Sequence, residues 1–452
     1  MITSPAFAGK RFAVLGLARS GAAAAEALLA SGAEVIAWDR QDVARAPFEG
    51  RCRLIDPLEL DLTGFAGVVV SPGVPLNTHP IGPHVWQYGL PVIGDIELFA
   101  MARPSLPKHR VVGITGTNGK STTTALVHHI LQTAGVPSVM GGNIGDPILG
   151  QDPLPEGGVY VLELSSFQID LTFTLDCDIA ALTNITADHL DRYAGFAAYA
   201  AAKERLFAMQ ERGVAVICDE DEPTGAIADR LAAADKPLLR VKTSDLDAAG
   251  LAEGRSPSLA GPHNAQNAAV AAVICRQLGL SEAQIAHGLA TYPGLPHRME
   301  RVCEAGGVIY INDSKATNTA SAAPALAAFP PVQGGAPLIH WICGGLPKEP
   351  GLGACAAHLG NLAAAYTVGE AGPMFADLLE GDGVKVERCE LISEAVRRAR
   401  DAARPGEVVL LSPACASYDQ FRDYEKRGHH FRQMVGAMTG CETDGSGRSI
   451  LP

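Results

Sequence analysis

A glycine-rich loop between an apolar strand and a helix constrains the fold of this chain more than any other feature. The loop is GITGTNGKSTTT at residues 113–124, and the apolar run VVGIT (111–115) leads into it. The helical pattern after the loop stops at Gly135. Glycines let a backbone approach phosphate oxygens, and the first turn of a helix offers free N–H groups and the positive end of its dipole. The sequence therefore predicts a strand–loop–helix unit that binds phosphate.

The spacing of this loop differs from that of the standard P-loop. The standard signature places a glycine five positions before the Gly-Lys-Ser/Thr end, and Ile114 occupies that position here. The ammonium of Lys120 can still reach phosphate oxygens, and the hydroxyl of Ser121 can be offered to Mg²⁺. The alternative is a glycine-rich turn that binds nothing. Strand, loop, Gly-Lys-Ser and helix in this order favour the phosphate site.

Strand and helix patterns alternate along the whole chain. Near the N-terminus, the strand pattern RFAVLGL (11–17) precedes an Ala-rich helix, and the strand pattern EVIAWD (34–39) follows it. After the glycine loop, long helices are predicted at 195–210 and 263–279, and the alternation is repeated from 307 onward. Such alternation predicts parallel sheets covered by helices, with ligands at the carboxyl ends of the strands.

Two proline-containing stretches interrupt this alternation, ARPSLPKHR (102–110) and TYPGLPHR (291–298). A chain of 452 residues is long enough for three domains of about 150 residues each. We therefore predict an α/β fold of three domains: an N-terminal Rossmann-like domain at 1–103, a central P-loop ATPase-like domain with a parallel sheet at 104–295, and a C-terminal Rossmann-like domain at 296–452.

The composition is ordinary for a soluble globular protein, with 47% apolar and 19% charged residues. The net charge of −13 and the absence of a Lys/Arg-rich run argue against a nucleic-acid surface. Ten scattered cysteines without a CxxC pair favour reduced thiols over disulfides or a structural zinc site. There is no signal-peptide pattern and no apolar run of about 20 residues. We expect a cytoplasmic monomer that binds no nucleic acid and enters no membrane.

The turn GLARSG (16–21) near the N-terminus is a weaker ligand signal. The dinucleotide fingerprint requires a glycine where Ala18 stands. Asp39 ends the next strand about 20 residues on, where an acid that binds ribose would lie. A bound nucleotide and plain packing of helix against strand both remain open. A nicotinamide cofactor is the less favoured occupant.

Nine short motifs occur in order between residues 113 and 421. They are GITGTNGKST (113–122), GGNIG (141–145), VLELSSFQ (161–168), TNITADHLDRY (183–193), AAKERLF (201–207), HNAQNAAVA (263–271), LPHRME (295–300), INDSKATN (311–318) and LSPACASYDQF (411–421). Together they closely resemble the Mur ligases of peptidoglycan synthesis, whose phosphate loop has the Gly-Thr-Asn-Gly-Lys form seen here. The ELSSFQ, DSKATN and SPACASYDQF versions are similar to those of the members that add D-glutamate.

The resemblance implies an ATP-dependent amide-bond ligase. ATP would phosphorylate the alanyl carboxylate of UDP-N-acetylmuramoyl-L-alanine to an acyl phosphate. The amine of D-glutamate would then attack, and phosphate would leave as the amide forms. Because a carboxylate is a poor electrophile and two polyanions must approach each other, metal ions and fixed cations would carry much of the catalysis.

The resemblance also implies which residues bind ATP. They are Gly116, Thr117, Asn118, Gly119, Lys120, Ser121, Thr122, Asn267, Arg298 and Asp313. Arg298 and Asp313 come from the third segment, so domain closure would complete the site and exclude water. The residues implied in catalysis are Lys120, His189 and Lys203.

Mg²⁺, as two ions, is the implied cofactor. Its implied ligands are Ser121, Glu163, His189 and Lys203. Without the resemblance, Glu163 would be an ordinary acid at a strand end and Lys203 a solvated helix residue. In the family, the lysine that matches Lys203 reacts with CO₂ to become a carbamate. Carbamylation would turn a cation into an anion able to bind a metal.

Two further residue sets follow from the resemblance. The UDP-substrate would be bound by Ser20, Asp39, Arg40, Ser71, Gly73, Asn143 and His189. D-Glutamate would be bound by Lys315, Thr317, Lys348, Ser417 and Tyr424. Among the residues predicted to bind D-glutamate, this chain departs from the pattern of the family. Leu-Pro precedes Lys348, and Tyr418 and Tyr424 stand where Leu and Phe are common, so a plain surface lysine at 348 remains an alternative.

Three other functions are alternatives to this predicted ligase activity. The first is a related ligase, either a Mur ligase for a different amino acid or a folylpolyglutamate synthetase, and ELSSFQ and SPACASYDQF argue against it. The second is a nicotinamide-dependent oxidoreductase, against which Ala18 and the glycine loop weigh. The third is a nucleotide-binding regulator, which would not need Glu163, His189 and Lys203. Cys415 has no activating base nearby in the sequence and is expected to be a buried thiol rather than a nucleophile.

Overall fold

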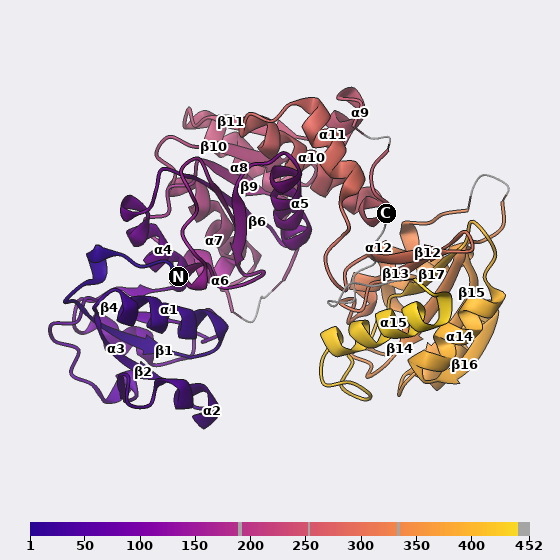
Figure 1. Cartoon of the computed structure of the whole chain (residues 1–452), viewed down its shortest axis with the longest axis horizontal. Coiled ribbons are helices and arrows are strands. Elements are labelled where there is room, and N and C mark those ends of the chain that lie inside the picture. Colours follow the sequence, from indigo (N-terminus) through magenta and orange to yellow (C-terminus); the bar gives the residue numbers. More distant parts are fainter. Residues whose placement is uncertain (189–191, 252–253, 332–334, 442–452) are drawn as a thin grey trace. The chain divides into compact units, whose positions relative to one another are not determined.

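The structure is a computed structural model that describes residues 1–188, 192–251, 254–331 and 335–441 (Figure 1). The chain forms two compact units, Met1–Leu251 with Gln266–Gly288, and Ala252–Ala265 with Leu289–Pro452. Two sheets lie in the first unit and a third in the second. The α/β prediction is confirmed, whereas the domain boundaries at 103 and 295 stay predictions. Within the described residues, no helix is long and apolar enough to cross a bilayer.

The first sheet is parallel throughout, in the order β3-β2-β1-β4-β5. Its strands are β1 (Arg11–Leu15), β2 (Glu34–Trp38), β3 (Arg53–Leu54), β4 (Gly67–Val70) and β5 (Val92–Ile93). The helices of this region are α1 (Arg19–Ala30), α2 (Asp42–Arg45), α3 (Ile81–Trp86) and α4 (Asp95–Ala102). Alternate residues of β1 are buried on opposite faces of the sheet, Phe12 in one apolar cluster and Ala13 in another.

The second sheet is also parallel, in the order β11-β10-β9-β6-β8-β7. Its strands are β6 (Arg110–Thr115), β7 (Ser138–Gly142), β8 (Val159–Glu163), β9 (Ile179–Leu182), β10 (Val214–Cys218) and β11 (Leu238–Val241). Its region holds α5 (Lys120–Thr133), α6 (Ser166–Asp170), α7 (Phe196–Ala208), α8 (Glu222–Ala233), α9 (Ser244–Ala248), α10 (Pro262–Gln277) and α11 (Glu282–Thr291). Strand order reverses at β6, and in parallel sheets ligands bind at such a switch point.

The third sheet is mixed, in the order β12-β13-β17-β14-β15-β16. Its strands are β12 (Glu300–Ala305), β13 (Val308–Asn312), β14 (Ile339–Gly344), β15 (Leu362–Val368), β16 (Val386–Glu390) and β17 (Val408–Leu411). Its helices are α12 (Thr319–Ala327), α13 (Gly372–Gly381), α14 (Ile392–Ala402) and α15 (Tyr424–Thr439). Apolar residues of α14 and α15 pack in one cluster on one face, and those of α12 and α13 pack in another on the other face.

One strand departs from the predicted parallel pattern. β12 pairs antiparallel with β13, because Gly306 and Gly307, both with positive φ, close a tight hairpin between them. Apolar and polar residues do not alternate strongly along β12, so the sequence did not predict this edge strand.

The expectation of reduced thiols is wrong for one pair of cysteines. Cys303 on β12 and Cys441, just after α15, form a disulfide, whereas the other eight cysteines are free. The pair is separated by 138 residues in the sequence. Only the packing of α15 against β12 brings the two together, so spacing alone could not reveal the pair.

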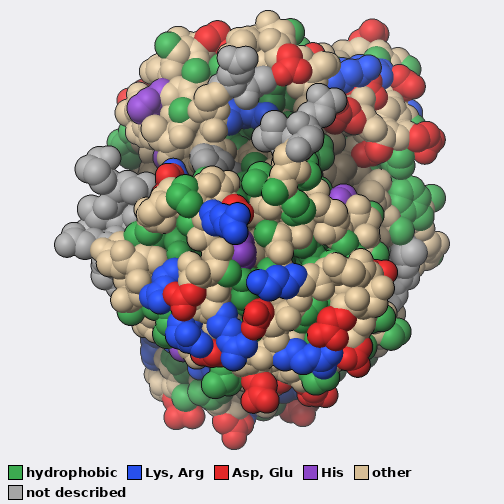
Figure 2. Space-filling model, turned by 90° about the vertical axis from the view of Figure 1, so that its right-hand side faces the viewer, with side chains coloured by type: hydrophobic (Ala, Val, Ile, Leu, Met, Phe, Trp, Pro, Cys, Tyr) green, Lys and Arg blue, Asp and Glu red, His purple; other side chains and the backbone are tan. Residues whose placement is uncertain are grey.

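Charges of both signs lie next to one another on the molecular face shown in Figure 2. Arginines of α14 form ion pairs of this kind: Arg397 pairs with Glu394 of the same helix (2.6 Å), and Arg398 pairs with Glu387 of β16 (2.8 Å). Such exposed pairs contribute little to stability, typically about 0.2–1 kcal/mol each.

Candidate active site

The glycine loop follows β6, the central strand of the second sheet, and α5 begins at Lys120 (Figure 1). Gly116 and Gly119 have φ angles of 147° and 81°, which side-chain-bearing residues rarely adopt. A Cβ at Gly116 would collide with Thr183 Oγ1, and one at Gly119 with Asn267 Oδ1. Both glycines are therefore required by the close packing of this loop as well as by its backbone conformation.

Two lysine ammonium groups converge on this loop. Lys120 Nζ donates hydrogen bonds to the carbonyls of Gly116 (3.0 Å) and Thr117 (2.8 Å). Lys203 on α7 is 1% exposed, and its Nζ donates to the same Gly116 carbonyl (2.7 Å). Burial, and then the charge of Lys120, lower the pKa of Lys203 to about 7. A substantial part of the Lys203 amine is therefore uncharged at neutral pH, unlike that of an ordinary lysine.

Glu163 ends β8 beside the loop strand, in register with Ile114 of β6. Its carboxylate is buried, and Oε1 accepts a hydrogen bond from Asn143 Nδ2 (3.0 Å). The other oxygen, Oε2, is buried and has no hydrogen-bond partner among the described residues. A buried carboxylate oxygen without a partner is costly, and it fits a hard cation such as Mg²⁺. Ser121, which carries a hydroxyl, is the second residue of α5 and directly follows the glycine loop.

The remaining predicted metal ligands are described only in part. His189 lies outside the described residues. Across the part of the chain that the structure describes, no group of three or more His, Cys, Asp or Glu side chains is placed to hold a metal by itself. Of the predicted ligands, Glu163 offers one carboxylate oxygen and Ser121 a hydroxyl, so phosphate oxygens would have to supply further ligands.

Asn267 is brought to the glycine loop from a distant part of the sequence. It lies on α10, is 2% exposed, and its Oδ1 accepts a hydrogen bond from Thr123 Oγ1 (3.4 Å). The backbone N–H of Asn118 is held by Asn184 Oδ1 (2.8 Å). These amides fix the conformation of the loop, so Asn267 shapes the site whether or not it also contacts a nucleotide.

The predicted UDP-substrate residues of the first sheet gather at the carboxyl ends of its strands. Asp39 Oδ2 accepts from the backbone N–H of Leu17 (2.7 Å), and Ser71 Oγ donates to the carbonyl of Gly16 (2.9 Å). These bonds tie the ends of β2 and β4 to the turn after β1. Of the other predicted residues, Arg40 and Gly73 lie on the loops after β2 and β4, and Ser20 lies in the first turn of α1.

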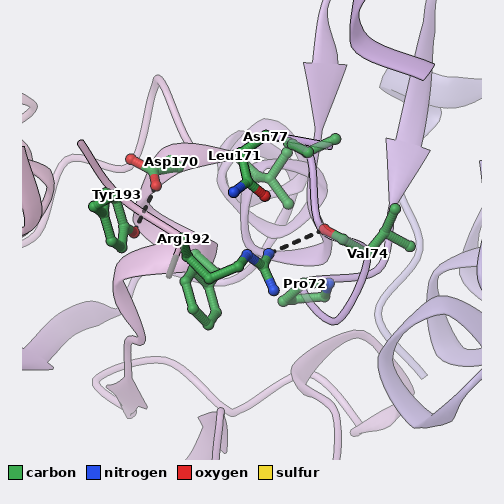
Figure 3. Close-up of a pocket in the computed structure, with 9 residues that line it drawn as sticks. Pro72, Val74, Asn77, Asp170, Leu171, Arg192 and Tyr193 are labelled. Atoms are coloured by element: carbon green, nitrogen blue, oxygen red, sulfur yellow. Dashed lines mark hydrogen bonds between the residues drawn. The ribbon is translucent and has the colours of Figure 1, made fainter. Parts of the chain in front are cut away.

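A pocket of about 140 Å³ lies within the first unit, beside Ser71 and Gly73 (Figure 3). It is lined by Pro72, Val74, Leu76, Asn77, Phe167, Asp170, Leu171, Arg192 and Tyr193. Arg192 Nη2 donates to the carbonyl of Val74 (3.1 Å), and its guanidinium stacks over the ring of Phe167 (4.2 Å). Tyr193 OH donates to Asp170 Oδ2 (2.7 Å).

Sequence reasoning missed this pocket, although part of the signal was present. Arg192 and Tyr193 end the motif TNITADHLDRY, and Phe167 lies in ELSSFQ. The two motifs predicted roles for Glu163 and His189 but none for these three residues. The partner loop, 72–77, carries no chemical motif of its own, so its proximity to Arg192 could be known only from the fold.

In the second unit, the residues predicted to bind D-glutamate form two contacts with one another. Lys348 Nζ donates to Thr317 Oγ1 (3.2 Å), and the ammonium of Lys315 lies over the ring of Tyr424 (4.0 Å). Ser417 is buried, at 2% exposure. The structure thus places Lys348 beside the DSKATN segment, and its binding of D-glutamate stays a prediction.

Arg427 on α15 is a buried residue that was not predicted. Its guanidinium donates to Ser314 Oγ (3.0 Å), to the carbonyl of Ser314 (2.8 Å), and to the carbonyls of Cys415 (3.0 Å) and Ala416 (3.2 Å). It therefore joins the DSKATN turn to the SPACAS loop. Burial raises the pKa of the Cys415 thiol to about 12, in agreement with the expectation that Cys415 is not a nucleophile.

Asp313 is buried at the end of β13. Its Oδ1 accepts from the backbone N–H of Met299 (3.1 Å), and its Oδ2 accepts from Ser412 Oγ (2.7 Å). Burial raises the pKa of this carboxyl to about 7. The carboxylate thereby fastens the turn that carries Arg298, the other residue predicted to bind ATP in this unit.

Comparisons with known proteins identify the family of this chain. Residues 114–275 match the Mur ligase middle domain, and residues 297–415 match the Mur ligase, glutamate ligase domain. The chain is 62% identical to a UDP-N-acetylmuramoylalanine–D-glutamate ligase of Novosphingobium aromaticivorans, over 97% of each chain. It is 58% identical to the ligase of the same name from Sphingopyxis alaskensis, over 97% of this chain and 100% of that one.

Solved structures show the same fold at low sequence identity. UDP-N-acetylmuramate–alanine ligase from Thermotoga maritima aligns with a TM-score of 0.55 at 17% identity, over 95% of this chain and 99% of that one. A UDP-N-acetylmuramoyl-L-alanyl-D-glutamate–2,6-diaminopimelate ligase aligns with the same TM-score at 18% identity, over 95% and 93%. The chain therefore belongs to the Mur ligase family and, within it, to the group of UDP-N-acetylmuramoylalanine–D-glutamate ligases.

Proposed function

We propose that the protein is an ATP-dependent ligase that adds D-glutamate to UDP-N-acetylmuramoyl-L-alanine in peptidoglycan precursor synthesis. The observation that carries this proposal is identity of 62% and 58%, over 97% of this chain, to two ligases of that name. Two features support a phosphate- and metal-binding role for the glycine loop. Lys120 and Lys203 both donate to the Gly116 carbonyl, and Glu163 Oε2 has no hydrogen-bond partner in the described part of the chain.

The proposed reaction has two steps. A carboxylate oxygen of the alanyl group attacks the γ-phosphorus of ATP, and ADP leaves, which gives an acyl phosphate. The amine nitrogen of D-glutamate then attacks the acyl carbon, the C–O bond to phosphate breaks, and the amide forms with loss of a proton. Lys120 neutralises charge that develops on the transferring phosphate, and the N–H groups at the start of α5 donate to its oxygens.

The residues proposed to hold Mg²⁺ are Ser121 and Glu163, with His189 and Lys203 as further predicted ligands. When bound, Mg²⁺ would supply positive charge that neutralises the phosphate oxygens. Asn143 keeps Glu163 oriented by its hydrogen bond to Oε1, which leaves Oε2 for the metal.

Lys203 is proposed to act as a carbamate. Only a neutral amine reacts with CO₂, and a pKa of about 7 makes that form available at neutral pH. The amine nitrogen bonds to the carbon of CO₂ and loses a proton, so the buried cation becomes an anion. With ¹³C-bicarbonate, the protein should show a carbamate resonance that Lys203→Ala lacks. Absence of that resonance, with full activity in CO₂-free buffer, would exclude the modification.

The pocket beside Ser71 and Gly73 is proposed to take part of the UDP-substrate, with Arg192 as a cation for its anionic groups. Lys348 is proposed to pair with a carboxylate of D-glutamate, since its ammonium already lies beside the predicted residue Thr317.

The proposal is tested by measuring phosphate release from ATP with UDP-N-acetylmuramoyl-L-alanine and a panel of acceptors. The panel contains D-glutamate, L-glutamate, L-alanine, L-lysine and meso-diaminopimelate, with UDP-N-acetylmuramate as a matched control for the first substrate. We expect release only when D-glutamate and the L-alanyl substrate are both present. Release with another acceptor, or none with D-glutamate, would refute the proposed function.

A further inference from the structure

The backbone on both sides of Arg298 is strained. His297 and Met299 have φ angles of 62° and 45°, in the left-handed region that disfavours residues with a Cβ. Only five non-glycine residues have positive φ in the described ranges, and two of them flank Arg298. Each such residue costs about 1–2 kcal/mol unless surrounding contacts hold it. The turn therefore needs a source of restraint.

A buried carboxylate supplies that restraint. Glu300, the first residue of β12, accepts hydrogen bonds at Oε2 from the backbone N–H of His297 (2.8 Å), from Asn312 Nδ2 (3.0 Å) and from Arg432 Nε (3.1 Å). Its Oε1 lies 2.6 Å from Arg432 Nη2, and the two side chains are 8% and 4% exposed. We name this buried pair the Glu300–Arg432 clamp.

The side chain of His297 is held from the same side. Asn312 Nδ2 donates to its Nδ1 (3.0 Å), and α15 approaches so closely that a Cβ at Gly428 would collide with that ring. Burial, and then the charge of Arg432, lower the pKa of His297 to about 3, so the ring stays neutral and Nδ1 accepts. The fixed ring and the clamp together define the conformation of the turn.

The side chain of Arg298, which this turn presents, does not stabilise the described part of the chain through polar contacts. The Arg298 guanidinium is half-buried and forms no hydrogen bond or ion pair with any residue that the structure describes. Buried ion pairs such as the clamp are expensive and are often no more stable than apolar substitutes. Here a costly buried ion pair holds a strained turn, and the turn presents an arginine that forms no hydrogen bond or ion pair with the described residues. Strain of this kind is typical of functional sites.

We propose that Arg432, acting through Glu300, is a positioning residue that aims Arg298 at the phosphates or ribose of ATP. The inference rests on the proposed function, because that function makes Arg298 an ATP contact. Arg432 touches no substrate itself. Its contribution is the conformation of residues 297–299.

A double-mutant cycle tests this inference in the full chain. Arg298→Ala, Arg432→Met and the double variant are compared for the KM of ATP, the KM of D-glutamate and the Kd of ADP with Mg²⁺. We expect Arg432→Met to raise the KM of ATP and the Kd of ADP about tenfold and to change the KM of D-glutamate less than about twofold. In the Arg298→Ala background, Arg432→Met should add less than about twofold, because both act through one contact.

Further variants keep the test decisive if Arg432→Met folds poorly. Arg432→Lys retains the charge without the planar fork and should restore nucleotide affinity in part. Glu300→Gln combined with Arg432→Met leaves no buried charge, and it should fold but still bind ADP weakly. Arg398→Met on α14 removes an ion-paired arginine of the same unit and should change neither constant.

Hydrogen exchange gives a readout that is independent of activity. In nucleotide-free protein, Arg432→Met should speed exchange of the backbone amides of His297 and Met299 about tenfold, and Arg398→Met should not. Multiplicative effects in the cycle, an equal rise in both KM values, or unchanged exchange at 297–299 would overturn the inference. A wild type that releases no phosphate with D-glutamate would instead refute the proposed function.

Discussion

At the scale of single residues, two acids on α4 show how burial and hydrogen bonding decide the state of a carboxyl group. Asp95 and Glu97 are both buried, at 3% and 4% exposure. Glu97 accepts hydrogen bonds from the backbone N–H groups of Phe173 (2.7 Å) and Thr174 (2.9 Å) and from Thr174 Oγ1 (2.7 Å). Neither carboxylate oxygen of Asp95 forms a hydrogen bond of ordinary geometry with a described residue, and burial, only partly offset by nearby N–H groups and Gln168, raises its pKa to about 6.

Asp95→Asn should therefore stabilise the protein at pH 8. A folded pKa of about 6, above the ordinary 3.8, means that proton binding contributes stability that is fully present below pH 3.8 and is lost as pH rises through 6. The ionised carboxylate then costs up to about 3 kcal/mol at pH 8, and the variant should recover about 1–3 kcal/mol of unfolding free energy there. Urea unfolding at pH 8, 6 and 5 should show this gain shrinking with falling pH.

Glu97→Gln is the matched control, since it weakens three hydrogen bonds two residues away. It should lose about 1–3 kcal/mol at pH 8. A gain for Asp95→Asn that is independent of pH would contradict the assigned protonation.

A second residue-scale prediction concerns Lys348. Lys348→Ala should raise the KM of D-glutamate about tenfold or more and leave the KM of ATP nearly unchanged, because it removes a charge-assisted contact to the amino acid only. Steady-state kinetics with each substrate varied in turn measures both constants. An unchanged KM for D-glutamate would mean that the amino acid binds elsewhere and that Lys348 is a surface lysine.

At the scale of elements, the glycine loop could be predicted from the sequence and its neighbours could not. Strand, loop and helix are local, so glycine spacing and helix periodicity identified β6 and α5. The packing of Asn267 and Thr183 against the loop depends on residues far along the chain. The same limit applies to Arg192 and the 72–77 loop, and to Arg427 between two motifs.

Gly119→Ala tests the role of this packing in nucleotide binding. The new methyl group would meet both an unfavourable φ of 81° and the Asn267 side chain, so the loop must shift. We expect the Kd of ADP with Mg²⁺, measured by calorimetry, to rise about tenfold or more, while the circular dichroism spectrum is unchanged.

Gly135→Ala is the control for the backbone effect alone. Gly135 ends the region of α5 with a φ of 77°, and a Cβ there would meet nothing within 4 Å. It should cost about 1 kcal/mol of stability and leave ADP binding intact. Equal losses of ADP affinity in both variants would show that the effect comes from α5 as a whole.

At the scale of the whole molecule, the alternation of strands and helices correctly predicted parallel α/β sheets. It did not reveal the antiparallel strand β12, whose pairing with β13 depends on the hairpin at Gly306 and Gly307. Nor did it reveal the disulfide between Cys303 and Cys441, which joins positions 138 residues apart. Local periodicity reports which elements form, whereas edge pairing and long-range contacts are set by how those elements pack.

The transfer of oxygen from substrate to phosphate tests the central claim most directly. UDP-N-acetylmuramoyl-L-alanine labelled with ¹⁸O in both alanyl carboxylate oxygens is incubated with the protein, ATP, Mg²⁺ and D-glutamate. If an acyl phosphate forms, the released phosphate carries one ¹⁸O and the amide product retains the other, as mass spectrometry of both would show. Amide product formed together with unlabelled phosphate, the second label appearing in water or in AMP, would contradict activation of the carboxylate as an acyl phosphate.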